Sequence, residues 1–166
     1  MTEELMTPKQ ALDAMIGCHR GFYIRAGGED LSPMYWLWRT SGEMVPVLLM
    51  SMPMKSEDRD ALAGMVKARA KQMGDVYMFA FISEAWTMPP LTPEEYKALK
   101  TMPSQSDKRI EVITTLIGHR DGRRIMDTHE LVRDWKTGKV VELKARDCHE
   151  DSVSGYVQSR FDLFAE

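Results

Sequence analysis

One uninterrupted apolar run does most to restrict the fold of this chain. Residues 76–82, Val-Tyr-Met-Phe-Ala-Phe-Ile, are apolar or aromatic at every position, so a strand built from them needs cover on both faces. The run is too short for a membrane helix, which needs roughly 20 residues. Gly74 precedes it at the place where a helix commonly ends. We therefore expect residues 76–82 to form a central strand, buried on both sides.

Two main helices are expected before this strand. Thr7 and Pro8 begin the first, because a capping hydroxyl followed by proline in the first turn favours a helix start. Apolar residues at helical spacing carry this helix to about Arg25. The second extends from Ser56 as its N-cap to Gly74, with acidic residues in its first turn, where the helix dipole favours them.

A hairpin is expected between the two helices. Residues 34–39 and 44–51 read as two strands joined by a Ser-Gly turn. Pro46 cannot donate to a sheet ladder, so the second strand should lie at an edge. Trp36 and Trp38 share one face of this peripheral hairpin, where large aromatic side chains are typical contact anchors. They are candidate binding residues, and the alternative is that they close the core.

The last third of the chain predicts a meander of three antiparallel strands, after a short helix from Thr92 to about Lys100. The meander strands are residues 109–118, 124–135 and 139–145. The tail over residues 148–166 fits an edge strand or an irregular helix. The expected fold class is therefore α+β, a mostly antiparallel sheet of about six strands with two main helices and one short helix packed on it, the helices covering one face.

Composition restricts the class of protein further. With 166 residues, 43% hydrophobic and 28% charged, the chain can enclose one core, so residues 1–166 should form a single globular domain. A net charge of −3 makes nucleic acid an unlikely partner, and ten Lys and Arg against six Asp and Glu in residues 108–146 fit solvated strand faces. Cys18 and Cys148 are too few for a disulfide framework, and the acidic N-terminus lacks the order of a signal peptide. We expect a cytoplasmic protein without membrane association.

Glu84 is the first candidate for a binding site. It follows the buried run directly, near the rim of the sheet, and Trp86 shares its face if the strand continues. A carboxylate beside an indole in a partly apolar setting can have a raised pKa and act as an acid, a base or a ligand anchor. The alternative is that Glu84 caps a loop or pairs with an arginine such as Arg109.

Asp127 and His129 form a second candidate, and its surroundings depend on strand register. If Asp121-Gly122 is a two-residue hairpin loop, His129 lies opposite Thr114 and Asp127 lies opposite Leu116. A longer loop shifts this pairing by one position. On a shared face the two residues can form an acid–histidine pair, although exposed charged residues on a half-solvated sheet give the same pattern, and we favour that interpretation.

Glu142-Leu143-Lys144 offers a catalytic alternative. An acidic residue on one strand, followed by Glu-x-Lys on the next, resembles the metal-binding motif of the PD-(D/E)xK nuclease superfamily over about 30 residues. The resemblance implies that Asp127 or Asp134 and Glu142 hold a divalent cation, that Lys144 helps to activate water, and that Gln158 assists. No Pro-Asp pair precedes the motif.

The sequence favours binding over catalysis. It contains no phosphate loop, no dinucleotide-binding glycine run and no metalloprotease or nucleophile-elbow motif. Cys18-His19 and Cys148-His149 are adjacent pairs with awkward geometry for zinc, so we expect no metal and no cofactor. Most of the fourteen methionines are expected to fill the core, whereas Met50, Met52 and Met54 around Pro53 are candidates for a pliable pocket or an exposed contact surface. We expect a non-catalytic binding or regulatory accessory module of bacterial or phage type, which binds a protein partner or itself as a homodimer, with a small-molecule ligand possible.

Overall fold

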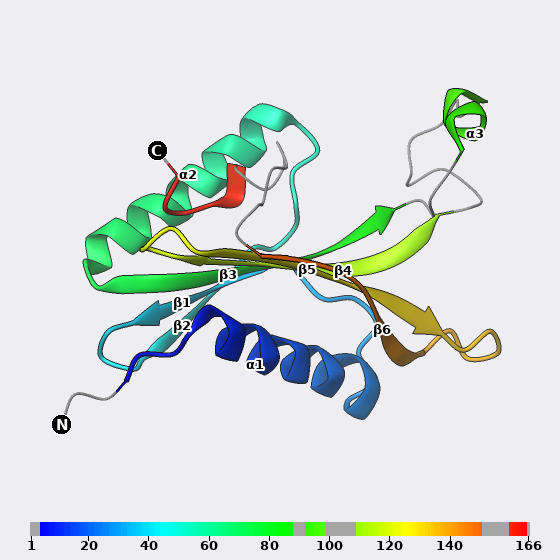
Figure 1. The fold of residues 1–166 in the computed structure, drawn as a ribbon, viewed down its shortest axis with the longest axis horizontal. Coiled ribbons are helices and arrows are strands. Elements are labelled where there is room, and N and C mark those ends of the chain that lie inside the picture. Colours follow the sequence, from blue (N-terminus) through cyan, green and yellow to red (C-terminus); the bar gives the residue numbers. More distant parts are fainter. Residues whose placement is uncertain (1–3, 88–91, 99–108, 151–159, 166) are drawn as a thin grey trace.

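The computed structural model describes residues 4–87, 92–98, 109–150 and 160–165. Within this part of the chain, six antiparallel strands form one sheet in the order β2-β1-β3-β4-β5-β6 (Figure 1). The helices are α1 (Pro8–Arg20), the π-helical turn η1 (Gly21–Arg25), α2 (Ser56–Met73) and α3 (Pro93–Ala98). The strands are β1 (Met34–Arg39), β2 (Met44–Leu48), β3 (Val76–Thr87), β4 (Ile110–His119), β5 (Arg124–Arg133) and β6 (Val140–Glu150). The α+β prediction is confirmed.

The predicted central strand is β3, which pairs with β1 on one side and β4 on the other. Residues 76–82 are all buried, as expected. The main helices do not share a face, however: α1 lies on one face of the sheet and α2 on the other (Figure 1). The expectation that helices cover one face was wrong, because a strand that is apolar on both sides needs a helix on each. We call these faces the α1 face and the α2 face.

Each face has its own core. The core of the α1 face contains Leu12, Met15, Tyr23, Trp38, Met78, Ile82, Ile113, Ile117, Leu131 and Leu143. The core of the α2 face contains Tyr35, Leu37, Val66, Phe79, Phe81, Leu116, Phe161 and Leu163. Burial of one such large side chain contributes roughly 1.5–3 kcal/mol, so both helices are held mainly by this apolar contact.

Both main helices begin and end near the predicted residues. Thr7 caps α1 through its side chain, and the helical run continues to Arg25, its last turn widened to a π-helix. Gly74 ends α2 in the left-handed conformation, with φ +81°. Ser56 is not the N-cap but the first helical residue, and its hydroxyl accepts a hydrogen bond from Arg160 at 2.6 Å.

The β1–β2 hairpin lies at the edge of the sheet, as Pro46 predicted. Arg39 N donates to Glu43 O and Leu49 N to Pro33 O, each at 2.9 Å. Because hydrogen-bonded and non-hydrogen-bonded pairs alternate in an antiparallel ladder, the backbone groups of Pro46 point away from β1. The missing N–H of this proline therefore costs no ladder bond.

The β4–β5 connection is one residue longer than the two-residue loop considered in the sequence. His119 N donates to Arg123 O at 3.0 Å, which leaves residues 120–122 as the loop, and Gly122 has φ +103°. Asp127 consequently lies opposite Thr115, and His129 lies opposite Ile113. The pairing with Leu116 and Thr114 was wrong by one position, since a third loop residue shifts the register.

The described end of the chain, residues 160–165, packs on the sheet. Strand β6 continues to Glu150, five residues beyond the predicted end, and Phe161 and Leu163 are buried on the α2 face. Arg124 holds Asp162 with a bidentate ion pair, one arm of which measures 3.0 Å. The short helix α3 stands beyond the ends of β3 and β4 (Figure 1). No helix in the described ranges combines the length and the apolarity needed to span a membrane.

Candidate functional site

A row of buried polar side chains lies on the α1 face beneath α1. Asp127 on β5 lies opposite Thr115 on the neighbouring strand β4 and opposite Cys148 on the other neighbouring strand, β6. His129 follows two residues after Asp127 and therefore shares its face, while α1 brings His19 down onto the row. His19, Thr115, Asp127 and His129 are all buried. The shared face was predicted, but the favoured interpretation as exposed charges on a solvated face is corrected, since α1 covers them.

The buried polar row is internally hydrogen-bonded. His129 Nδ1 lies 2.6 Å from Asp127 Oδ2, and His19 Nε2 lies 3.0 Å from Thr115 Oγ1. The pKa of His19 is lowered to about 4, chiefly by burial; the electrostatic interaction with His129 adds to this, and the carboxylate of Asp127 opposes it. His19 is therefore a neutral core residue at physiological pH.

Cys148 extends this row but is poorly suited to nucleophilic chemistry. Burial raises the pKa of its thiol, and so do the charge of Asp127 and a hydrogen bond to that carboxylate. A reactive cysteine needs the opposite, a cationic neighbour that stabilises the thiolate. Asp127, not His129, lies opposite Cys148, and its carboxylate favours the protonated thiol.

Glu84 lies inside β3 and anchors the chain that follows α1. Its carboxylate accepts a hydrogen bond from the hydroxyl of buried Tyr23 in η1 and another from Leu31 N at 2.7 Å. Burial raises the pKa of Glu84, whereas these two hydrogen bonds lower it. The geometry matches the loop-capping alternative. Tyr23 was not a predicted partner, because π-helical winding of η1 brings it over the sheet.

An ion pair between Arg133 and Glu111 lies near Glu84. The guanidinium of Arg133 makes two 2.7 Å hydrogen bonds to the carboxylate of Glu111, and it also donates to Glu29 O at 3.1 Å and Gly138 O at 2.8 Å. The Arg133 side chain thus ties β4 to two loops. The sequence signal for it, an arginine and a glutamate at the ends of neighbouring strands, is too common to single out.

Trp86 lies on the same face as Glu84 and is partly exposed. The guanidinium of Arg109 stands 4.5 Å from the centroid of its ring, a cation–π contact. Glu84 and His129 occupy one cross-strand row, but buried Ile113 lies between them. The two predicted binding groups therefore do not converge on one cavity.

The structure does not bring the nuclease-like residues together. Leu131 and Leu143 are paired and buried on the α1 face, so Glu142 and Lys144 on either side of Leu143 point to the α2 face, opposite to Asp127. The alternative carboxylate, Asp134, accepts hydrogen bonds from two backbone N–H groups of its own turn. Gln158 lies outside the described residues. Within those residues, no group of three or more His, Cys, Asp or Glu side chains is arranged to hold a metal ion.

The hairpin tryptophans belong to the core rather than to a contact surface. Trp38 is buried in the α1-face core, and Trp36 is half-buried against it. This corrects the prediction of surface anchors: the N-terminal chain around Met6 and the helix α1 cover the face that both rings share.

Exposed apolar side chains instead follow the edge strand. Leu48 is 65% exposed, and Met50 and Met54 in the next loop are each 93% exposed. Met44, at the start of β2, is also exposed. We call these four side chains the β2 edge surface. The sequence had singled out Met50, Met52 and Met54 around Pro53, but Met52 is partly buried against the α2-face core.

A hollow lies at the C-terminal end of α2. It has a volume of about 760 Å³, within the range of small-molecule sites. Its described lining comes from the C-terminal half of α2, the start of β3, the β4–β5 loop and the chain end: Lys67, Ala70, Lys71, Gly74, Val76, Arg120, Leu163, Phe164 and Ala165. We call it the α2 cavity. Sequence gave no sign of it, because its wall joins segments far apart in the chain.

Comparison of the chain with models of known families, with curated proteins and with solved structures found no match. The functional argument below therefore depends on the geometry alone.

Proposed function

We propose that this protein is a non-catalytic binding module that pairs with a second copy of itself through the β2 edge surface. The exposure of Leu48, Met50 and Met54 carries the proposal. Three large apolar side chains within seven residues form a patch that loses contact with water only when another surface covers it.

The chemistry of the patch suits self-association. Residues 44–54, Met-Val-Pro-Val-Leu-Leu-Met-Ser-Met-Pro-Met, include no charged residue. In a two-fold dimer each patch faces its own copy, so any charge on it would meet a like charge. An uncharged, methionine-rich patch avoids this repulsion and can adapt its shape to the partner.

Pro46 limits how the two copies can meet. Its backbone points outward from the sheet but has no N–H to donate, so it interrupts a ladder between two β2 strands. Contact through side chains is therefore favoured over continuation of the sheet. Contact limited to a few side chains predicts weak association, roughly micromolar.

The use of the two polar clusters supports a non-catalytic role. The carboxylate of Glu84 holds Tyr23 and Leu31, and that of Asp127 holds His129. Glu84 holds η1 and the following loop on the sheet, and Asp127 fixes the ring of His129 on β5, whereas a catalytic acid or base must face its substrate.

Sedimentation velocity over roughly 1–200 µM protein tests the proposal, since a micromolar dimer dissociates within this range. We expect the wild type to shift from monomer to dimer as concentration rises, and Leu48→Glu or Met50→Glu to stay monomeric. The added carboxylate would have to be buried against its own copy.

Val141→Glu is the matched control. Val141 is 55% exposed, similar to Leu48, but lies on β6 at the opposite edge of the sheet. The Val141→Glu variant should therefore dimerise to the same extent as the wild type. A wild type that remains monomeric at 200 µM, or a Val141→Glu variant that alone loses the dimer, would refute the proposal.

A further inference from the structure

The α2 cavity combines three cationic side chains with an apolar floor. Lys67 and Lys71 stand four residues apart on α2, so they project from the same side of the helix. Arg120 approaches from the β4–β5 loop, where its backbone N donates to Tyr77 O at 2.9 Å. Val76 and Leu163 are buried beneath them. The positive groups therefore stand at the rim of a hollow whose base is apolar.

Within the described residues, these positive charges have little compensation from carboxylates. None of the cavity's described lining residues is acidic, and in the described structure neither Lys71 nor Arg120 has an ion-pair partner. Three described carboxylates stand next to lining residues in the chain, and each is paired elsewhere: Asp75 with Arg39, Asp121 with Arg123 and Asp162 with Arg124. Lys67 donates to Ala165 O, which engages one of its three protons. The cavity thus concentrates positive charge in a chain whose net charge is −3.

The C-terminus of α2 also borders the cavity, at Gly74, and its carbonyl groups carry negative charge. The helix dipole there amounts to roughly half an elementary charge. Favourable interaction with it accounts for one lysine in the last turn, such as Lys71, but not for Lys67 a turn earlier or for Arg120 on a separate loop. The charge around the cavity therefore remains positive after the helix dipole is taken into account.

We infer that the α2 cavity binds a small amphipathic anion. Its phosphate or carboxylate group contacts Lys67, Lys71 and Arg120, and its flat apolar body lies against Val76, Leu163 and the ring of Phe164. The volume of about 760 Å³ accommodates a ligand of nucleotide size. This site shares no lining residue with the β2 edge surface, so the inference does not depend on the proposed dimer.

Isothermal titration calorimetry with two matched ligand pairs tests the inference. Adenosine 5′-diphosphate and adenosine share a body but differ in phosphate, and 2-naphthoate and 2-naphthamide share a body but differ in charge. We expect the charged member of at least one pair to bind at least about tenfold more tightly, as a charge-assisted hydrogen bond predicts. The pair that responds identifies phosphate or carboxylate as the preferred group.

Pyrophosphate tests the apolar half of the site. It carries the charge of the nucleotide without the flat body, so it should bind more weakly than the preferred ligand. Equal affinity for pyrophosphate and adenosine 5′-diphosphate would overturn the assignment of the apolar floor.

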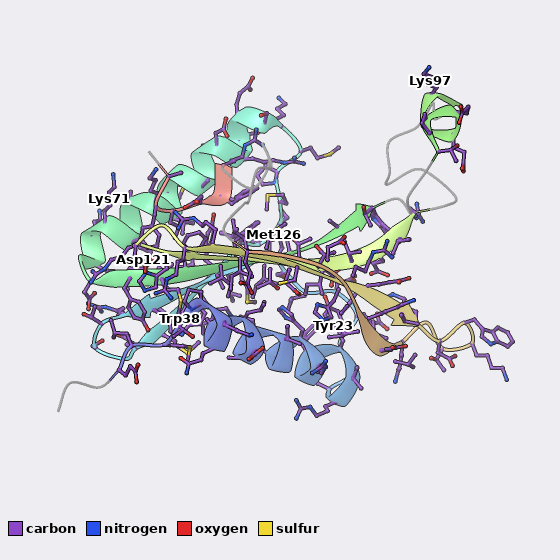
Figure 2. The ribbon with its side chains drawn as sticks, viewed as in Figure 1. Tyr23, Trp38, Lys71, Lys97, Asp121 and Met126 are labelled. Atoms are coloured by element: carbon purple, nitrogen blue, oxygen red, sulfur yellow. The ribbon has the colours of Figure 1, made fainter. Side chains whose placement is uncertain are left out.

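Lys71→Gln and Arg120→Gln test the location. Each should weaken binding about fivefold or more at low salt, and rising salt should weaken wild-type binding, because the contacts are partly exposed and screened. Lys97→Gln, on α3, is the control: Figure 2 shows Lys71 and Asp121 at one end of the molecule and Lys97 at the other. It removes the same charge and should leave affinity unchanged.

Two results would overturn the inference. One is that none of the four charged and neutral organic probes binds the wild type at millimolar concentration. The other is that Lys71→Gln and Lys97→Gln weaken binding equally, which would show that only the net charge of the protein matters.

Discussion

Acidification should destabilise the fold through one buried histidine. His19 is buried between α1 and the sheet, with its Nε2 3.0 Å from Thr115 Oγ1. Burial is the main cause of its lowered pKa, about 4 against 6.5 for an exposed histidine. Protonation in the folded state would place a charge beneath α1, where only the nearby Asp127 carboxylate favours it.

The direction and size of the effect follow from the two pKa values. Between pH 6.5 and pH 4 the unfolded chain binds a proton at His19 that the folded chain does not. Stability from this residue is therefore fully present above pH 6.5 and is lost as the pH falls toward 4. The full loss amounts to roughly 3 kcal/mol, of which about 2 kcal/mol is lost by pH 5.

Urea unfolding at pH 7.5 and pH 5.0, followed by tryptophan fluorescence, measures this loss. His19→Gln is the informative variant, because a carboxamide can still reach Thr115 but does not titrate. We expect the free energy of unfolding of the wild type to fall by about 2 kcal/mol more than that of His19→Gln over this interval.

His119→Gln is the control. The pKa of His119 is also lowered by burial, but Asp121 lies 3.0 Å from it and raises the pKa in opposition. Replacing His119 should change the pH dependence of the free energy of unfolding less than replacing His19 does. If His19→Gln retains the full pH dependence of the wild type, the burial argument is refuted.

Two further changes test the packing of the sheet and the Glu84 anchor. Gly118→Ala should lower the free energy of unfolding by about 1–3 kcal/mol, because the new Cβ would lie 2.3 Å from the buried ring of Phe79. Gly64→Ala has open space around the new Cβ and should raise the free energy of unfolding by up to about 1 kcal/mol. Urea unfolding that showed a change of the same sign for both variants would contradict this. Tyr23→Phe should cost about 1–2 kcal/mol and raise the pKa of Glu84 further, since it removes a hydrogen bond to the carboxylate; an unchanged Glu84 titration by NMR would show that this bond is unimportant.

The sequence placed the secondary structure but not the site. Asp127 and His129 were correctly placed on one face, because side chains alternate along any strand. Their burial was not predicted, since it depends on where α1 docks. Likewise Glu84 was found from its position after an apolar run, but its partner Tyr23 lies 61 residues away, on the π-helical turn.

What the sequence determined by itself were the local features: the buried strand over residues 76–82, the capped start at Thr7, the glycine that ends α2 and the edge position of Pro46. Each depends on backbone chemistry or on apolar pattern over a few neighbouring residues. Tertiary structure alone decided that the helices take opposite faces and that the cations of the α2 cavity meet. These outcomes depend on contacts between distant segments, and one residue more in a loop changes which side chains face each other.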